Sequence, residues 1–187
     1  MIVVASDHGL QLGEHGISGE CPAGMYPELI DCVLMVRHPR GKGAGRRSRA
    51  LVQHHDVAAT VLGFLGVRAP SELDGCDLTP IIEGRSESVR DHATCGYAMN
   101  VWCRDSEFVL ICRNTGEEPQ LFDLARDPLQ MQNAAWDNPR VVQRLYDLML
   151  EDAGGGPIAP DYALPNPKVF QGVRWLDWSP YRPFLMP

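Results

Sequence analysis

The sequence contains no apolar run of the roughly 20 residues that a membrane-spanning helix needs. Its opening residues 1–5, MIVVA, carry no basic residue and form too short an apolar run for a signal peptide. No segment repeats elsewhere in the chain. The lack of a long apolar run argues against a helical membrane protein, and the lack of repeats argues against a repeat protein. We expect no membrane partner.

Paired cysteine motifs are also missing. The six cysteines include no C-x-x-C pair and show no spacing typical of a zinc site. In a chain of 187 residues they are better explained as reduced, partly buried thiols than as a disulfide framework. We therefore expect a cytoplasmic protein.

Basic residues are too few for a general binder of nucleic acid. Lys and Arg number 17 against 24 Asp and Glu, which gives a formal net charge of −7. The exception is residues 37–49, RHPRGKGAGRRSR, where Gly and basic residues alternate. This segment predicts a solvated loop, and the alternative is an electropositive rim that attracts an anionic substrate.

A polar turn follows the first apolar run. Residues 1–5 predict a strand buried on both faces of a parallel sheet, and Ser6-Asp7-His8-Gly9 follows at once. Ligands of open α/β sheets bind beyond the carboxyl ends of strands, and Asp7 and His8 offer the oxygen and nitrogen donors that suit a divalent metal. We expect Gly9 to adopt a backbone conformation that other residues avoid. The alternative is a polar turn that only caps a buried strand.

The rest of the first half predicts a second strand and one long helix. Residues 31–37 form another apolar run, which ends at a proline. Residues 56–66 predict a helix with Asp56 as its N-cap and Gly66 as its stop. Short helical turns are expected at 26–30 and 79–83, and the expected inner face of the long helix carries Val57, Val61, Leu62 and Leu65.

Three further histidines lie in loops or at a helix entry. His15 could face the site, but an ordinary hydrogen bond to the backbone is the preferred explanation. His54 and His55 stand at the start of the long helix, where a structural role in the turn is preferred to metal binding.

The second half changes in character at residue 85. Three strand-like runs separated by polar turns predict an antiparallel meander, at residues 92–103, 107–113 and 120–124. An amphipathic helix is expected over 138–152, with Val142, Leu145, Leu148 and Met149 inward. The expected units are therefore an α/β part over 1–84, a small sheet with one helix over 85–156, and an irregular tail rich in Pro and aromatic residues over 157–187.

Taken in order, several of these segments resemble the C-terminal part of a sulfatase, a family of the alkaline-phosphatase-like superfamily. The segments are SDHG at 6–9, LGEHG at 12–16, YPEL at 26–29, VLMVRHP at 33–39, VQHHDV at 52–57, TVL at 60–62, DGCDL at 74–78 and LFDLARDP at 121–128. The resemblance implies an α/β/α sandwich followed by a small antiparallel sheet subdomain with one packing helix. It also implies that the whole enzyme hydrolyses a small anionic sulfate ester with the help of one divalent metal. Ca²⁺ is the preferred metal, and Mg²⁺ and Mn²⁺ are the alternatives. Asp7 and His8 match the family's second metal motif, with Asp7 the firmer match because His8 stands where the family varies between Asn and His.

The sequence departs from the family in three ways. It has no Cys-x-Pro/Ala-x-Arg motif, the source of the family's formylglycine nucleophile, and Cys21-Pro-Ala-Gly-Met25 does not replace it. The acidic pair that supplies the other metal ligands is also absent. Similar members carry a lysine that contacts the transferred group where Glu20 stands here, and a carboxylate there repels an anionic ester. We therefore assign no catalytic residue, and expect that the N-terminal part of the fold is missing, that metal binding is weak and that the chain alone gives no turnover.

Two alternatives remain open. The same metal pair serves a phosphonate monoester or phosphodiester hydrolase of the superfamily. The missing nucleophile and Glu20 also fit a catalytically dead interaction module.

Overall fold

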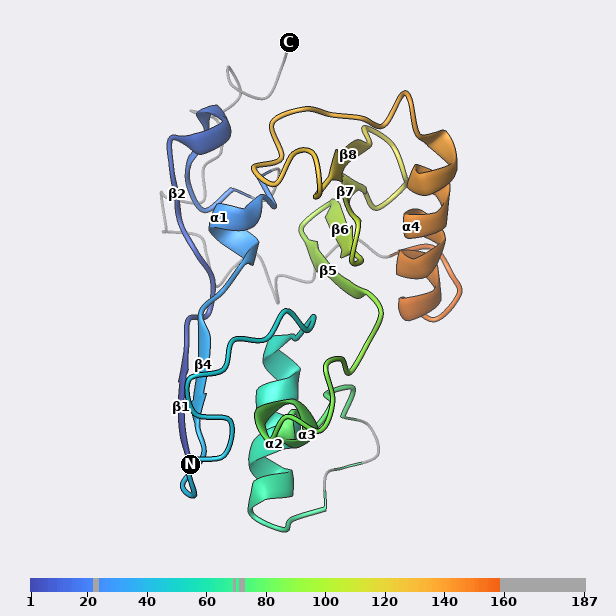
Figure 1. The fold of residues 1–187 in the computed structure, drawn as a ribbon. Helices are drawn as coiled ribbons and strands as arrows, with labels where there is room; N and C mark the ends of the chain where they lie inside the picture. The colour runs from blue at the N-terminus through green and yellow to red at the C-terminus, as the bar shows by residue number, and fades with distance from the viewer. Residues whose placement is uncertain (22–23, 69, 71–72, 159–187) are drawn as a thin grey trace, which may run out of the picture.

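We describe a computed structural model of the chain, in which residues 1–21, 24–68, 70 and 73–158 are placed. The chain forms two lobes (Figure 1). One holds strands β1 (Ile2–Ala5) and β4 (Leu34–Arg37) with helices α2 (His54–Phe64) and α3 (Thr79–Ile82). The other holds a four-stranded sheet, β5 to β8, with helix α4 (Pro139–Asp152). Nearly all of the predicted tail lies outside the described residues.

The first strand pairs differently from the sequence prediction. β1 and β4 form an antiparallel pair, with Ile2 opposite Arg37 and Ala5 opposite Leu34. The prediction of a parallel strand buried on both faces was therefore wrong. A short apolar run does not distinguish parallel from antiparallel pairing, and here the connection from residue 6 to 33 brings the chain back along β1.

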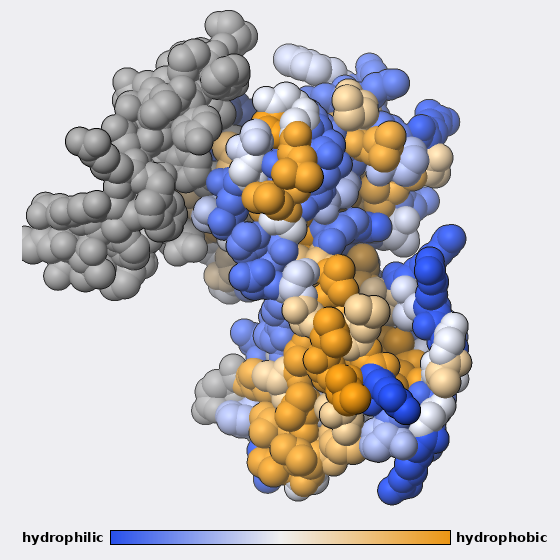
Figure 2. Space-filling view, turned by 90° about the vertical axis from the view of Figure 1, so that its left-hand side faces the viewer, coloured by the Kyte–Doolittle hydropathy of each residue, from blue (hydrophilic) through white to orange (hydrophobic). Residues whose placement is uncertain are grey.

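One face of the β1–β4 pair is exposed. Ile2, Val4 and Met35 are 57%, 50% and 58% exposed, and Val4 lies directly opposite Met35 in the register. Figure 2 views the molecule from the side on which these strands lie in Figure 1, and apolar residues gather over this lobe. We call Ile2, Val4 and Met35 the exposed sheet face.

The long helix begins earlier than predicted. Gln53 is the N-cap of α2, and Asp56 is the third helical residue, where its carboxylate accepts the backbone N–H of Gln53 at 2.7 Å. Gln53 and Asp56 form a capping box, so Asp56 is not itself the cap. At the other end, the backbone N–H of Val67 donates to the Leu62 carbonyl while Gly66 adopts a φ of +69°, so the predicted stop at Gly66 is confirmed.

The buried face of α2 also differs from the prediction. Its buried residues are Asp56, Ala59 and Thr60, whereas Leu65 is 66% exposed. The polar residues are satisfied internally, because the Thr60 hydroxyl donates to the Asp56 carbonyl and accepts the N–H of Leu78. The spacing of apolar residues therefore did not predict the buried face of α2, because two of its three buried residues are polar.

The second lobe is the predicted meander with an additional hairpin. Its strands are β5 (Ala93–Tyr97), β6 (Asn100–Arg104), β7 (Phe108–Arg113) and β8 (Gln120–Asp123), all antiparallel and in sequence order. The predicted single run at 92–103 is two strands, because the chain turns at residues 98–99, where Ala98 adopts a φ of +54°. No Gly or Asn marks this turn in the sequence.

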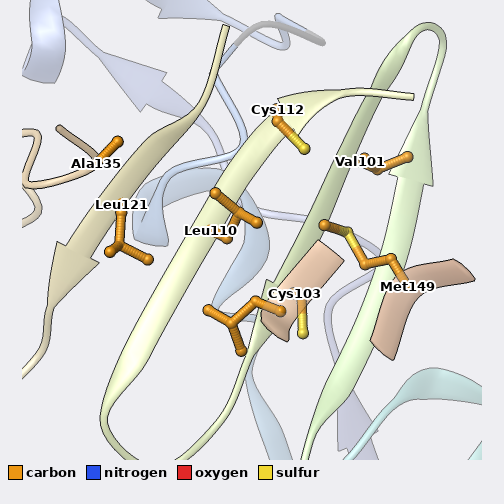
Figure 3. Close-up of a cluster of buried hydrophobic side chains, with 8 residues drawn as sticks. Val101, Cys103, Leu110, Cys112, Leu121, Ala135 and Met149 are labelled. Atoms are coloured by element: carbon orange, nitrogen blue, oxygen red, sulfur yellow. The ribbon is translucent and has the colours of Figure 1, made fainter. Parts of the chain in front are cut away.

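Helix α4 covers one face of this sheet. Leu145 and Met149 are buried against the strands, and Val142 and Leu148 pack at the margin, so the predicted helix and its inner face are confirmed. Figure 3 shows this core, to which β6, β7, β8 and α4 contribute; the labelled residues are Val101, Cys103, Leu110, Cys112, Leu121, Ala135 and Met149.

A loop region with short elements leads from β1 to β4. It contains β2 (Gln11–Leu12), a 3-10 turn (Glu14–Gly16), β3 (Ser18–Gly19) and helix α1 (Pro27–Ile30). β2 and β3 pair as a small hairpin, and Pro27 opens α1 as predicted. Within the described residues, no helix has the length and apolar character that crossing a bilayer requires.

A buried ion pair joins the two lobes. The Arg90 guanidinium donates to both carboxylate oxygens of Asp56 at 2.5 Å each, and the Asp56 side chain is fully buried. Further links join Gln53 Nε2 to the Thr94 carbonyl at 2.7 Å and the Tyr26 hydroxyl to Gln120 at 2.6 Å. We call Asp56 and Arg90 the lobe clamp.

All six cysteines lie in the described part of the chain and are free thiols. Burial raises the pKa of Cys95, Cys103 and Cys112 to about 12, so these thiols stay protonated and behave as small apolar side chains.

Candidate metal centre and cavity

Asp7 and His8 lie directly beyond the end of β1. The Asp7 side chain is 89% exposed, and its Oδ1 accepts the backbone N–H of His8 at 2.9 Å. Hydrogen bonds from the backbone N–H groups of His8 and Asp7, with the nearby His8 ring, lower the pKa of the Asp7 carboxyl. Asp7 is therefore a charged, accessible oxygen donor at neutral pH.

The His8 ring is oriented by its own backbone neighbour. Its Nδ1 lies 2.7 Å from the carbonyl oxygen of Gly9, and because that oxygen can only accept, Nδ1 carries the proton. When the ring is neutral, Nε2 is left as the free acceptor, the arrangement typical of a metal-binding imidazole. The Gly9 carbonyl, followed by the Glu20 and Asp7 carboxylates, raises the pKa of His8.

Gly9 is required here by close packing. A Cβ at this position would lie 1.9 Å from the carbonyl oxygen of Glu28, and the Gly9 N–H donates to the Leu29 carbonyl at 2.9 Å. Gly9 is not among the glycines with positive φ, so the expected unusual conformation was wrong. The need for glycine comes from α1, which lies against the strand end.

Neighbouring segments hold the strand end in place. The Ser6 hydroxyl accepts the Val33 N–H at 2.9 Å, and His54 Nε2 lies 2.7 Å from the Ser6 carbonyl. His54 therefore positions the backbone next to Asp7 from the start of α2, which agrees with its preferred structural role. His55 lines the adjoining cavity and lies 3.7 Å from Asp56.

His15 does not reach the site. Its ring stacks on Tyr26 with centroids 3.8 Å apart, and its Nε2 lies 3.6 Å from a carboxylate oxygen of Glu28. The expected backbone hydrogen bond of this ring is replaced by stacking and an acidic neighbour. A structural role is therefore correct, although the partners differ from the prediction.

Asp7 and His8 open onto a cavity of about 630 Å³ between the lobes. The first lobe contributes the strand end, Glu20 and the start of α2, and the second lobe contributes the face of the sheet that carries Cys95, Tyr97, Trp102 and Arg104. The cavity is therefore a two-sided pocket whose walls come from segments about 90 residues apart.

Glu20 lies beside His8 in this cavity. Its Oε2 is 3.6 Å from His8 Nε2, and the Tyr97 hydroxyl donates to its Oε1 at 3.3 Å. The carboxylate that the sequence singled out thus faces the candidate metal centre. An anionic ester bound at Asp7 and His8 would meet this negative charge.

The residues present fit part of a metal's coordination sphere. Asp7 supplies a charged oxygen and His8 Nε2 a nitrogen, whereas Ca²⁺ takes 6 to 8 oxygen-rich ligands. Among residues 1–21, 24–68, 70 and 73–158, no group of three or more His, Cys, Asp or Glu could hold an ion. Two donors of suitable chemistry are therefore in place, and the described residues do not add a third.

Sequence reasoning missed two cavity residues, Tyr97 and Arg104. Arg104 was expected in a turn, but it is the last residue of β6 and donates to Asp31 of the first lobe at 3.2 Å. No local pattern could have revealed this contact, because it joins residues 73 positions apart.

Comparison with known proteins gives consistent matches. Residues 13–152 match the family N-sulphoglucosamine sulphohydrolase, C-terminal. An N-acetylglucosamine-6-O-sulfatase of Bacteroides thetaiotaomicron is 32% identical over 146 residues, which cover 71% of this chain and 26% of that protein. Arylsulfatase K of Xenopus laevis is 26% identical over 162 residues, or 77% of this chain and 29% of the relative.

Solved structures show the same fold. The structure of BT4656 in complex with its substrate D-glucosamine-2-N,6-O-disulfate matches with a TM-score of 0.71 at 29% identity, over 81% of this chain and 33% of that one. Phosphonate monoester hydrolase of Agrobacterium radiobacter matches with a TM-score of 0.72 at 25% identity, over 82% and 34%. The chain spans between a quarter and about a third of the length of these proteins, and the matched family range begins after Asp7 and His8. With its small antiparallel sheet and packing helix, the chain belongs to the C-terminal family of the N-sulphoglucosamine sulphohydrolases, sulfatases of the alkaline-phosphatase-like fold.

Proposed function

We propose that this chain supplies one side of the metal site and part of the substrate cavity of a sulfuric ester hydrolase. The observation that carries the proposal is the placement of Asp7 and His8 in the lining of the cavity between the lobes. Sulfatase relatives support this reaction class, and the sulfated glucosamine bound by BT4656 supports a sulfated sugar as the kind of substrate.

Asp7 and His8 would hold the divalent cation, which we propose to be Ca²⁺. When bound, the cation supplies Lewis-acid polarisation and neutralises charge on the ester oxygens. Asp7 would contribute the charged oxygen, and the hydrogen bond from Nδ1 to the Gly9 carbonyl leaves Nε2 of a neutral His8 free to act as the nitrogen donor. His54 and Ser6 fix the backbone from which both side chains project.

We further propose that the chain alone binds metal weakly and gives no turnover. Two donors leave most of the coordination sphere to water, and no Cys-x-Pro/Ala-x-Arg segment is present to supply the nucleophile. The cavity would then bind a substrate without converting it.

Calcium titration by calorimetry tests the metal assignment. We expect wild-type protein to bind Ca²⁺ with millimolar affinity, and Asp7→Asn to remove the binding. Asp74→Asn is the matched control, because Asp74 is exposed and does not line the cavity. Binding that survives Asp7→Asn, or no binding by the wild type, would refute the assignment, and the second result favours a dead interaction module. Metal-dependent hydrolysis of 4-nitrophenyl sulfate would refute the expected lack of turnover.

A phosphonate monoester hydrolase is the second candidate. The match to the phosphonate monoester hydrolase of Agrobacterium radiobacter favours it. Competition between phenyl sulfate and phenylphosphonate for the Ca²⁺-loaded protein distinguishes the two. Tighter binding of the phosphonate would support this second candidate.

A further inference from the structure

The cavity contains cationic side chains that a metal-bound ester group would leave unused. Besides the histidines, its charged lining consists of three acidic residues, Asp7, Glu20 and Asp31, and two basic residues, Arg49 and Arg104. A cation at Asp7 accounts for one carboxylate. Arg49 and Arg104 are the groups available to attract further negative charge.

Arg104 is mounted rigidly on the second lobe. It ends β6, a strand paired on both sides, opposite Ala93 of β5 and Val109 of β7. Alternation along the strand places it on the same face as Trp102, which is buried and also lines the cavity. The guanidinium therefore projects from a fixed strand, the kind of support that a specific binding group needs.

Within the described residues, much of the hydrogen-bonding capacity of Arg104 is unused. Among these residues Nη1 is the guanidinium nitrogen with a partner, and it donates to both oxygens of Asp31 at 3.2 and 3.4 Å. Nε is enclosed without an acceptor, and Nη2 has none among the described residues. One nitrogen shared by two oxygens is a weaker contact than the paired fork that guanidinium forms with a carboxylate or sulfate.

Arg104 lines the same cavity as the candidate metal centre. Its partner Asp31 immediately precedes Cys32, whose Sγ lies 3.7 Å from the Asp7 carbonyl oxygen. The Arg104 side chain is 29% exposed, so its charge acts in a partly shielded environment where electrostatic attraction is stronger than in water. A sugar-sized molecule held at Asp7 could therefore present a second group to Arg104.

We propose that Arg104 is a specificity-determining residue that binds a second anionic group, a sulfate or carboxylate, on the ester substrate. Asp31 pairs with the Arg104 guanidinium when the second anionic group is absent, and the bound group displaces Asp31. The preferred substrate class is then a sugar ester with two anionic groups. This inference rests on the proposed function, because the first anionic group is placed by the metal at Asp7 and His8.

Binding of two probes to the Ca²⁺-loaded full chain tests the proposal by calorimetry. The probes are D-glucosamine-6-sulfate and D-glucosamine-2-N,6-O-disulfate. One charge-assisted contact predicts that the wild type binds the disulfate about tenfold more tightly. Arg104→Gln should remove this preference and leave the affinity for the monosulfate unchanged, whereas Arg104→Lys should retain part of it.

Asp31→Asn provides the opposite test. Asp31 is 53% exposed, so its replacement should not affect folding, and freeing Arg104 should increase the affinity for the disulfate. Arg113→Gln is the matched control, because Arg113 pairs with Glu118 on the same sheet but does not line the cavity. It should change neither affinity.

The outcomes separate this inference from the proposed function. Monosulfate binding that depends on Ca²⁺, with a disulfate preference unaffected by Arg104→Gln, would overturn the inference alone. A fall in disulfate affinity in Asp31→Asn would also overturn it. Failure of both probes to bind the Ca²⁺-loaded wild type would overturn the proposed function and, with it, the inference.

Discussion

Glu20 places a negative charge beside His8, at the point where the resemblance to sulfatases expects a lysine. We predict that Glu20→Lys increases the affinity of the Ca²⁺-loaded protein for inorganic sulfate by about tenfold, because a repulsive charge becomes an attractive one. Calorimetric titration with sulfate measures the change. Glu107→Lys is the control, since it changes the net charge equally at an exposed position outside the cavity. An equal gain in both variants would show that only net charge matters.

The lobe clamp is the residue pair on which stability should depend most strongly. Burial alone would raise the pKa of Asp56, but hydrogen bonds from Arg90 and from the backbone N–H groups of Cys76 and Gln53 outweigh it and lower the pKa. Arg90→Met leaves a buried, uncompensated carboxylate, which should cost about 3–5 kcal/mol of unfolding free energy. Urea unfolding at pH 7 measures this loss.

An exposed pair supplies the control for that prediction. Arg46→Met removes the Arg46–Glu87 contact, where the Glu87 side chain is 82% exposed, and should cost less than about 1 kcal/mol. Equal losses in the two variants would contradict the special role of the buried pair.

The same pair predicts how stability depends on pH. Because the pKa of Asp56 is lowered in the folded state, its contribution is complete above the unfolded pKa of about 3.9 and is lost as the pH falls further. Wild-type unfolding free energy should therefore drop below about pH 4. In Arg90→Met this acid-dependent loss of unfolding free energy should be smaller. Urea titrations between pH 3 and pH 6 measure the loss in both proteins, and an equal loss in the two would contradict the prediction.

At the scale of elements, the sequence predicts α4 well and the strands less well. The apolar spacing of α4 identifies its inner face because a single helix packs on a single sheet. The β5–β6 hairpin was missed because Ala98 adopts a left-handed conformation that its residue type does not indicate. The predicted parallel pairing of β1 was wrong because the relative direction of two paired strands depends on the connection between them. Here that connection is the 28 residues from 6 to 33.

Helix α4 should account for much of the stability of the second lobe. Leu145 is fully buried in the core between α4 and the sheet, so Leu145→Ala should lower the unfolding free energy by about 2–5 kcal/mol. Urea unfolding followed by circular dichroism measures the change. Gln143→Ala, on the exposed side of α4, is the control and should shift it by less than about 0.5 kcal/mol. A loss below about 1 kcal/mol for Leu145→Ala would mean that the core re-forms around the gap.

At the scale of the whole molecule, the exposed sheet face predicts self-association. Ile2, Val4 and Met35 present apolar area on a two-stranded sheet, and exposed patches of this kind favour association. We expect the apparent mass in light scattering to rise with protein concentration, and Met35→Lys to reduce that rise. Leu12→Lys, which alters an even more exposed apolar residue outside this face, should leave the rise unchanged. A mass that does not depend on concentration in the wild type would contradict the prediction.

The cavity shows where sequence reasoning stops. Asp7 and His8 could be proposed from a short motif, because a strand end and its next residues are local features. Tyr97 and Arg104 could not, since their place in the wall depends on how a second sheet lies against the first lobe. Sequence order predicted the family, whereas the set of residues that line the pocket depends on contacts between distant parts of the chain.

Opening of the lobe clamp should affect two regions of the protein at once. The carboxylate of Asp56 accepts the backbone amides of Gln53 and Cys76 while Arg90 binds it from the linker to the second lobe. We expect those amide protons to exchange with solvent when the clamp opens, and the same opening should free the start of α2, from which His54 supports the strand end next to Asp7. We therefore expect opening of the lobe clamp and loosening of the candidate metal centre to occur together.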